Sequence, residues 1–139
     1  MACVLTVDDE ILAVKTSGAL EPSERQKVLK QIVSIYDNSS ARAIIVDHRD
    51  SNIICSKQEA IDFGVMIDFM FSDRWPCFIA VLVDEQSETL ELIDLSVFRA
   101  NAGSSEIDIR TFHDEEQARK AVAVWREEHG GGGDIAVLP

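Results

Sequence analysis

Basic residues are scarce in this sequence. Its 13 Lys and Arg residues stand against 25 Asp and Glu residues, which gives a formal net charge of −12 at pH 7. A protein that binds nucleic acid needs clustered cations for the phosphates, so this balance argues against nucleic acid as a partner. It also disfavours docking onto anionic lipid headgroups. The charge favours a soluble protein, and it favours a basic partner surface or a cation.

Cysteine and histidine are also few. Cys3, Cys55 and Cys77 are widely spaced and form no Cys-x-x-Cys pair, so the sequence predicts neither a zinc site nor a redox pair. We expect reduced thiols in a cytoplasmic protein. The three histidines are isolated and show no metal-ligand spacing. The sequence therefore predicts no bound metal and no cofactor.

Long apolar runs are absent. A charged residue interrupts every candidate segment, so we expect no transmembrane span, and residues 1–4 have no basic region ahead of an apolar one that would suggest a signal peptide. A chain of 139 residues is long enough to bury one core. We predict a single domain over residues 1–129 and a flexible glycine-rich tail over residues 130–139.

Short β-prone runs recur along this domain. Residues 3–7 and 11–16 flank an acidic turn and predict a hairpin. Residues 43–46 and 78–83 are continuous apolar runs, typical of strands buried on both faces of a parallel sheet with helices on each side. Residues 107–112 alternate and predict an edge strand.

Helical patterns separate these runs. The four helices are predicted to begin near Pro22, Ser56, Ser87 and Asp114, and Gly103 is expected to cap the third. Asp114 and the glutamine three residues later match a capping box. The order is β-β-α-β-α-β-α-β-α. It predicts the α/β class, with a central mixed, mostly parallel sheet of four to five strands and about four helices.

Five stretches, spread over residues 3 to 128, stand out: "VKTSGALEPSERQKVL", "AIIVDHRD", "SKQEAIDFG", "FIAVLVDE" and "IDIRTFHDEEQARKAVAVW". They resemble a known family, the STAS domain of sulfate transporters and anti-sigma factor antagonists. They also look like the small bacterial STAS-like proteins grouped with CRAL-TRIO lipid-binding domains. The resemblance implies a STAS-like fold and a non-enzymatic signalling or interaction role in the bacterial cytoplasm. Its CRAL-TRIO side implies an alternative, a carrier of a small apolar ligand or lipid.

Ser56 is a candidate phosphorylation site by the same resemblance. In anti-sigma factor antagonists a strand ends in Asp, and a helix then opens with Asp-Ser-Ser-Gly, whose first Ser is phosphorylated. Here Asp47 takes the strand-end position and "CSKQ" replaces the motif, so only Ser56 matches it. The residues themselves offer a second interpretation, because Ser56 and Glu59 before an apolar helix form a capping box. A phosphate is also favourable at a helix N-terminus, so the two interpretations are compatible.

Polar residues crowd the end of the strand predicted over residues 43–46. Asp47, His48 and Asp50 form a candidate loop site, because open α/β sheets place ligands at the carboxyl ends of their strands. Between two carboxylates, His48 could hold a raised pKa, and with Cys55 it could form a nucleophilic pair. The alternative is a polar loop in which the aspartates make turns and pair with Arg49. No oxyanion loop accompanies the cluster, so we predict no enzyme.

The second predicted helix is apolar nearly all round, whereas a helix on a sheet needs only one apolar stripe. Large adaptable apolar side chains of this kind recur at binding surfaces. We interpret them as a homodimer or partner interface, or as the wall of an apolar ligand pocket. The alternative is that a neighbouring helix or the tail covers them. The third helix is broadly apolar too, and we predict self-association through both. The candidate residues are Phe63, Met66, Phe69, Met70 and Phe71.

Overall fold

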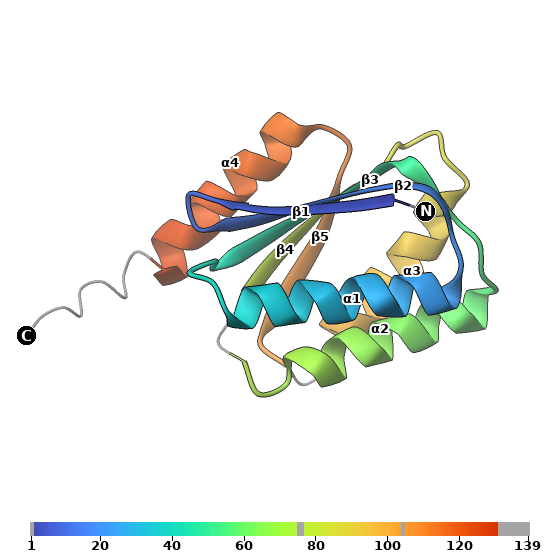
Figure 1. Cartoon of the computed structure of the whole chain (residues 1–139), viewed down its shortest axis with the longest axis horizontal. Helices are drawn as coiled ribbons and strands as arrows, with labels where there is room; N and C mark the ends of the chain where they lie inside the picture. Colours follow the sequence, from blue (N-terminus) through green and yellow to red (C-terminus); the bar gives the residue numbers. More distant parts are fainter. Residues whose placement is uncertain (1, 75–76, 104, 131–139) are drawn as a thin grey trace, which may run out of the picture.

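The computed structural model describes residues 2–74, 77–103 and 105–130 and confirms the predicted order of elements (Figure 1). The predicted tail lies outside the described residues, apart from Gly130. The strands are β1 (Ala2–Asp8), β2 (Ile11–Leu20), β3 (Ala43–Ile53), β4 (Cys77–Leu82) and β5 (Ile107–Phe112). The helices are α1 (Pro22–Asp37), α2 (Lys57–Phe71), α3 (Thr89–Asn101) and α4 (Glu115–Trp125), followed by a π-helical turn over Arg126–Gly130.

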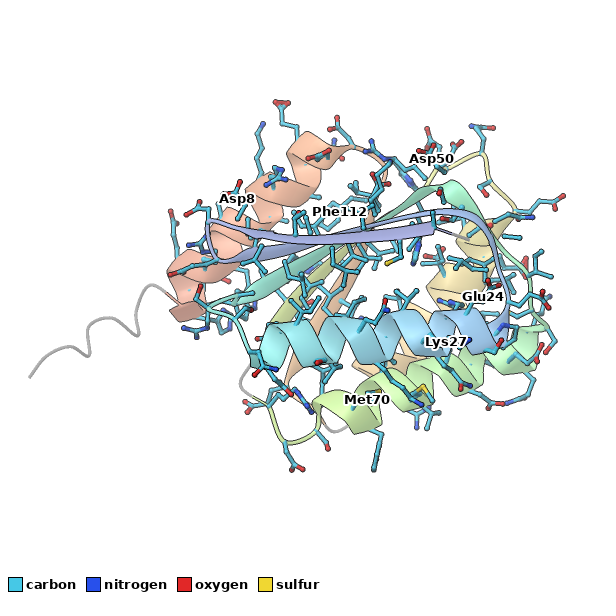
Figure 2. All side chains as sticks on the ribbon, in the orientation of Figure 1. Asp8, Glu24, Lys27, Asp50, Met70 and Phe112 are labelled. Atoms are coloured by element: carbon cyan, nitrogen blue, oxygen red, sulfur yellow. The ribbon has the colours of Figure 1, made fainter. Side chains whose placement is uncertain are left out.

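The five strands form one sheet in the order β1-β2-β3-β4-β5, so β5 is an edge strand as predicted. The β1–β2 hairpin is antiparallel and the other three pairs are parallel. Parallel neighbours have their carboxyl ends at the same edge of the sheet. Asp50 lies at that end, away from the β1–β2 turn near Asp8 (Figure 2).

Helices cover both faces of the sheet, as the apolar runs predicted. Alternate residues of β3 point to opposite faces. Ile44 and Val46 belong to a core cluster that includes residues of α1, α2 and α3. Ile45 belongs to a second cluster, in which Trp125 of α4 stacks on Phe78 of β4 with ring centroids 6.0 Å apart. Three helices therefore pack on one face of the sheet and α4 packs on the other.

A β-bulge interrupts the pairing of β2 with β3. Lys15 pairs with Asp47 and Ser17 pairs with Asp50, so β3 carries one extra residue opposite Thr16. Strand β3 continues past this bulge to Ile53, which pairs with Leu20. The prediction that residues 47–50 form a loop is therefore wrong, because pairing with β2 keeps this polar segment extended. Bulges often re-aim side chains next to functional sites.

The helix termini agree with the sequence patterns in part. The Glu21 N–H donates to the Glu24 carboxylate at 3.0 Å, just before Pro22. Asp114 caps α4, but it accepts from the Glu116 N–H at 2.7 Å. The C-cap of α3 is Ala102 and not the predicted Gly103. A side chain at Gly103 would collide with the Asp68 carboxylate, so close packing accounts for this glycine. No helix within the described residues is both long and apolar enough to cross a bilayer.

Candidate functional site

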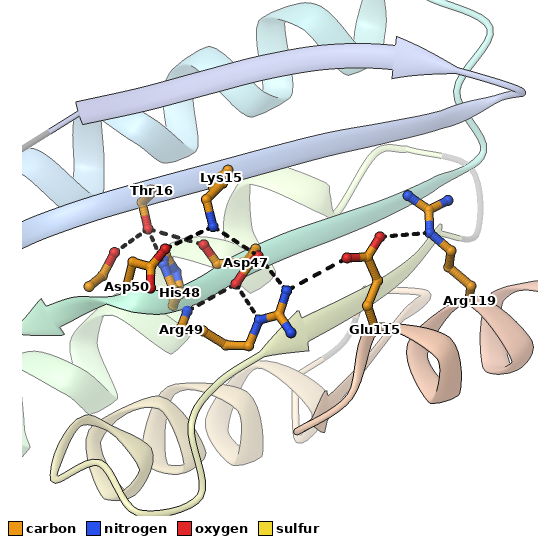
Figure 3. A network of polar contacts seen from close by, with 9 residues as sticks. Lys15, Thr16, Asp47, His48, Arg49, Asp50, Glu115 and Arg119 are labelled. Atoms are coloured by element: carbon orange, nitrogen blue, oxygen red, sulfur yellow. Dashed lines mark hydrogen bonds and ion pairs between the residues drawn. The ribbon is translucent and has the colours of Figure 1, made fainter.

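Asp47 lies at the centre of a polar network on the α4 face of the sheet (Figure 3). Its carboxylate accepts from the Arg49 side chain at 3.0 and 2.9 Å, from the Arg49 N–H at 3.0 Å and from Lys15 Nζ at 3.3 Å. Lys15 also pairs with the exposed Asp50 at 3.0 Å. The predicted pairing with Arg49 is confirmed, although it occurs within a strand.

This network leaves Asp47 little capacity for a ligand. Burial alone would raise the pKa of Asp47, but the hydrogen bonds and charge of Arg49, with the charge of Lys15, lower it to about 2. The carboxylate is therefore ionised and occupied by the protein's own donors. Arg49 continues the network to Glu115 at the start of α4, at 3.6 Å. That contact is largely exposed, and such ion pairs contribute little to stability.

His48 points to the opposite face of the sheet, towards α1, α2 and α3. Its Nδ1 lies 2.6 Å from Thr16 Oγ1, which in turn lies 2.6 Å from Ser51 Oγ. Burial first, and then the charge of Arg25, lower the pKa of His48 to about 3, while Asp47 opposes the shift. The expectation of a raised pKa is wrong, because strand alternation turns the imidazole away from both neighbouring carboxylates and into the interior.

Cys55 does not form a nucleophilic pair with His48. In the part of the chain that the structure describes, no hydrogen bond joins the two side chains. Burial raises the pKa of the Cys55 thiol, although Arg25 partly opposes this. A catalytic cysteine needs the thiolate at neutral pH, and this environment disfavours it. The same described ranges contain no group of His, Cys, Asp and Glu side chains that could hold a metal ion.

Arg25 of α1 is buried in the helix layer, and the sequence interpretation missed it. Only 6% of the residue is exposed. Its guanidinium lies 3.9 Å from the centroid of the Phe63 ring of α2, and its Nη1 lies 3.4 Å from Ser96 Oγ of α3. Its helical position is the signal that could have revealed it, because Arg25 shares one face of α1 with Val28 and Leu29.

An internal cavity of about 70 Å³ lies between this helix layer and the sheet. Arg25, His48 and Ser96 are its polar wall. The rest of the lining is apolar and comes from the sheet and all three helices: Leu20, Val28, Leu29, Ile32, Ile44, Val46, Phe63, Ile67, Ile79, Val81, Ile93, Val97 and Ile109. The cavity is thus a small apolar space with polar groups on one side.

Ser56 caps α2 by the predicted capping box. Its Oγ accepts from the Glu59 N–H at 3.1 Å, and its own N–H donates to Glu59 Oε1 at 2.9 Å. Both residues are exposed, so Ser56 is accessible to modification although it also caps the helix.

We expect Ser56→Ala to lower the free energy of unfolding by about 1 kcal/mol, because the Glu59 N–H loses its acceptor. Ser56→Asp is the matched control, since it keeps an oxygen acceptor and adds a negative charge at the helix N-terminus. Urea denaturation of the two variants measures the difference. Equal losses in both would contradict a capping role.

The five apolar candidates of α2 do not form one surface. Phe71 is 2% exposed and belongs to the core, so its prediction as an interface residue is wrong. Phe63, Met66 and Met70 are partly buried against that core. Phe69 alone is open to solvent, with 76% of its surface exposed. The cause is helical spacing, which places Phe71 on the buried side of α2 with Ala60, Gly64 and Ile67.

Two further apolar side chains of α2 and α3 are exposed. Val65 of α2 is 41% exposed, and Phe98 of α3 is 67% exposed. Helices α2 and α3 pack closely, since a Cβ at Gly64 would lie 2.5 Å from the Ser96 carbonyl oxygen. We call Val65, Phe69 and Phe98 together the α2–α3 patch. Ser96, Arg99 and Ala100 form the side of α3 that faces α2, so Phe98 lies on another side of α3. The sequence interpretation named only Phe69 among them.

Comparison with known proteins finds similarity in structure alone. No family model and no curated protein matches the chain. An uncharacterised DUF3478 protein with a SpoIIAA-like fold from Shewanella loihica PV-4 is 15% identical, with a TM-score of 0.50, over 86% of this chain and 90% of that one. The phosphorylated Bacillus cell fate determinant SpoIIAA is 13% identical, with a TM-score of 0.50, over 86% of this chain and 99% of that one. The chain therefore has a SpoIIAA-like fold, and the STAS-like fold predicted from the sequence is confirmed.

Proposed function

We propose that this protein is a non-enzymatic interaction module that self-associates through the α2–α3 patch. The single observation that carries the proposal is the exposure of two phenylalanines, Phe69 and Phe98, on neighbouring helices. Exposed aromatic side chains are typical anchors of protein interfaces. The SpoIIAA-like fold supports the same class of function at the level of architecture.

A second copy of the chain is a suitable partner for this patch. In a two-fold symmetric contact the two copies use the same surface, so Phe69 of one copy packs beside Phe98 of the other. A shallow depression offers a place for Phe69 of the other copy. Its apolar lining is Leu90, Leu95 and Phe98, and its polar lining is Ser87, Glu88, Glu91 and Asp94. The net charge of −12 repels two copies at a distance, so the contact should tighten as salt screens this repulsion.

We expect the wild-type chain to form a dimer, and Phe69→Ser or Phe98→Ser to weaken dimerisation about tenfold or more. Either change removes an exposed ring without touching the core. Sedimentation equilibrium over a range of protein and salt concentrations measures the dissociation constant.

Val124→Ser is the matched control for this measurement. Val124 is also an exposed apolar residue, but it lies on α4, on the other face of the sheet. It should leave dimerisation unchanged. A wild-type chain that remains monomeric at every concentration, or a loss equal in the control, would contradict the proposal.

Regulation by a phosphate on Ser56 is part of the proposed function. The serine is exposed at the start of α2, the helix that carries Phe69. Free N–H groups of the first turn favour a phosphate there, while the neighbouring Glu59 opposes it. Phosphopeptide mapping of the protein from its native cell tests whether Ser56 is phosphorylated. Consistent absence of phosphorylated Ser56 would contradict this regulation.

The cavity gives little support to the alternative of a lipid carrier. Its volume of about 70 Å³ is roughly half of the ~150 Å³ that holds one benzene molecule. A lipid chain is much larger than benzene and does not fit. The interaction module is therefore the better supported function.

A further inference from the structure

Arg25 carries a buried positive charge. Within residues 2–74, 77–103 and 105–130, no carboxylate pairs with its guanidinium. Its polar neighbours are the Ser96 hydroxyl and the Cys55 thiol, and its charged plane rests on the Phe63 ring. Burial lowers the pKa of Arg25 to about 10, so the side chain is still a cation at neutral pH. Buried cations are normally paired, and an unpaired one favours any anion that can reach it.

The surroundings of Arg25 specify the rest of a ligand. On one side lies the internal cavity, whose other polar members are His48 and Ser96. The His48 ring is neutral, because its pKa is about 3, and Thr16 occupies its Nδ1. The wall therefore holds one cation and neutral hydrogen-bonding groups. Everything beyond it is apolar, which suits a short hydrocarbon chain.

We propose that the cavity binds a small monocarboxylate, with the carboxylate on the Arg25 guanidinium and a short alkyl chain among the apolar side chains. Arginine presents two parallel N–H donors that match a carboxylate. The cavity has about half the volume that the six carbon atoms of benzene need, so it holds an alkyl chain of about three carbon atoms, and the carboxylate lies at its mouth. This site lies inside the helix layer and does not depend on the α2–α3 patch.

Access to the site is from the gap between α1 and α2. Arg25 and Phe63 also border an outer groove, which is lined by Pro22, Gln26, Cys55, Glu59, Asp62 and Met66. The same two side chains therefore separate the cavity from the surface. Glu59 and Asp62 at the groove repel anions in proportion to their charge, so a single charge is disfavoured least. An apolar tail can pass the Phe63 ring and leave the carboxylate at Arg25.

Titration with sodium butyrate tests the proposal. The protein carries isotope-labelled Ile, Leu and Val methyl groups, and the cavity residues Val28, Ile93 and Val97 report binding by NMR. We expect saturable shifts of these methyl signals, with a dissociation constant on the order of 1 mM. Sodium chloride at equal concentration controls for ionic strength. 1-Butanol controls for the chain without the charge and should bind at least tenfold more weakly.

Arg25→Met is the decisive variant. It keeps much of the apolar stem and removes a buried unpaired charge, so it should fold well, and it should weaken butyrate binding at least tenfold. Arg119→Met, on α4 across the sheet, is the matched control and should leave binding unchanged. If Arg25→Met fails to fold, Arg25→Gln takes its place. No saturable shift in the cavity methyls, or equal binding of butanol or of the Arg25 variant, would overturn the assignment.

Discussion

Lowering the pH from 7 to 4 should reduce the free energy of unfolding by about 3 kcal/mol through His48 alone. The pKa of His48 is lowered to about 3 in the folded protein, by burial first and then by Arg25, against an ordinary value near 6.5. Between these two values the unfolded chain binds a proton that the folded protein does not. The contribution of His48 to the free energy of unfolding is therefore fully present above about pH 6.5. It is lost progressively as the pH falls towards 3.

His48→Asn separates this effect from the titration of the carboxylates. Asparagine keeps a hydrogen-bonding group for Thr16 but does not titrate. Urea denaturation near pH 7, 5.5 and 4 measures the free energy of unfolding. Its decrease between pH 7 and 4 should be smaller in the variant than in the wild type, by about 3 kcal/mol. NMR gives a second readout, since the His48 ring signals should not titrate between pH 7 and 4. A wild-type ring that titrates near pH 6.5 would contradict the burial argument.

Much of the fold could be predicted because burial imposes simple patterns. Residues 43–46 and 78–83 are apolar without a break, and they form strands β3 and β4 with helices on both faces. The end of β3 could not be predicted in this way. Its second half, from Asp47 to Ile53, is mostly polar, and it stays extended because β2 pairs with it across the bulge. Pairing between distant strands leaves little trace in the local sequence.

The candidate site could be predicted only in part. Asp47 and His48 are neighbours in the sequence, but strand alternation sends them to opposite faces. Asp47 is the buried centre of an ionic network, and His48 lines a cavity. Arg25 was missed because its charge suggests a surface position, although its helical phase places it with Val28. Phe71 was assigned to a binding surface because large apolar side chains are common there. Its position in the helix instead places it in the core.

Gly64→Val should cost about 3 kcal/mol. A Cβ at Gly64 would lie 2.5 Å from the Ser96 carbonyl oxygen and 2.8 Å from the Arg99 Cβ. Both are atoms of α3 that cannot rotate away, so α2 and α3 must separate. Separation also weakens the bond from Ser96 Oγ to the Ala60 carbonyl, now 2.6 Å long. The same bond holds Ser96 beside Arg25, so the change should also disturb the cavity.

The sign of the stability change in Gly64→Ala distinguishes an effect of packing from an effect of helix propensity. Alanine in a helix is favoured over glycine by about 1 kcal/mol, so propensity alone predicts that Gly64→Ala stabilises the protein. Contact with the Ser96 backbone predicts the opposite, with a loss smaller than that of valine. Val65→Ala, one residue along on the exposed side of α2, is the matched control and should change stability by no more than about 0.5 kcal/mol. Urea denaturation of the three variants decides between packing against α3 and helix propensity. A stabilised Gly64→Ala would mean that α2 and α3 are less closely packed than the contact at Gly64 requires.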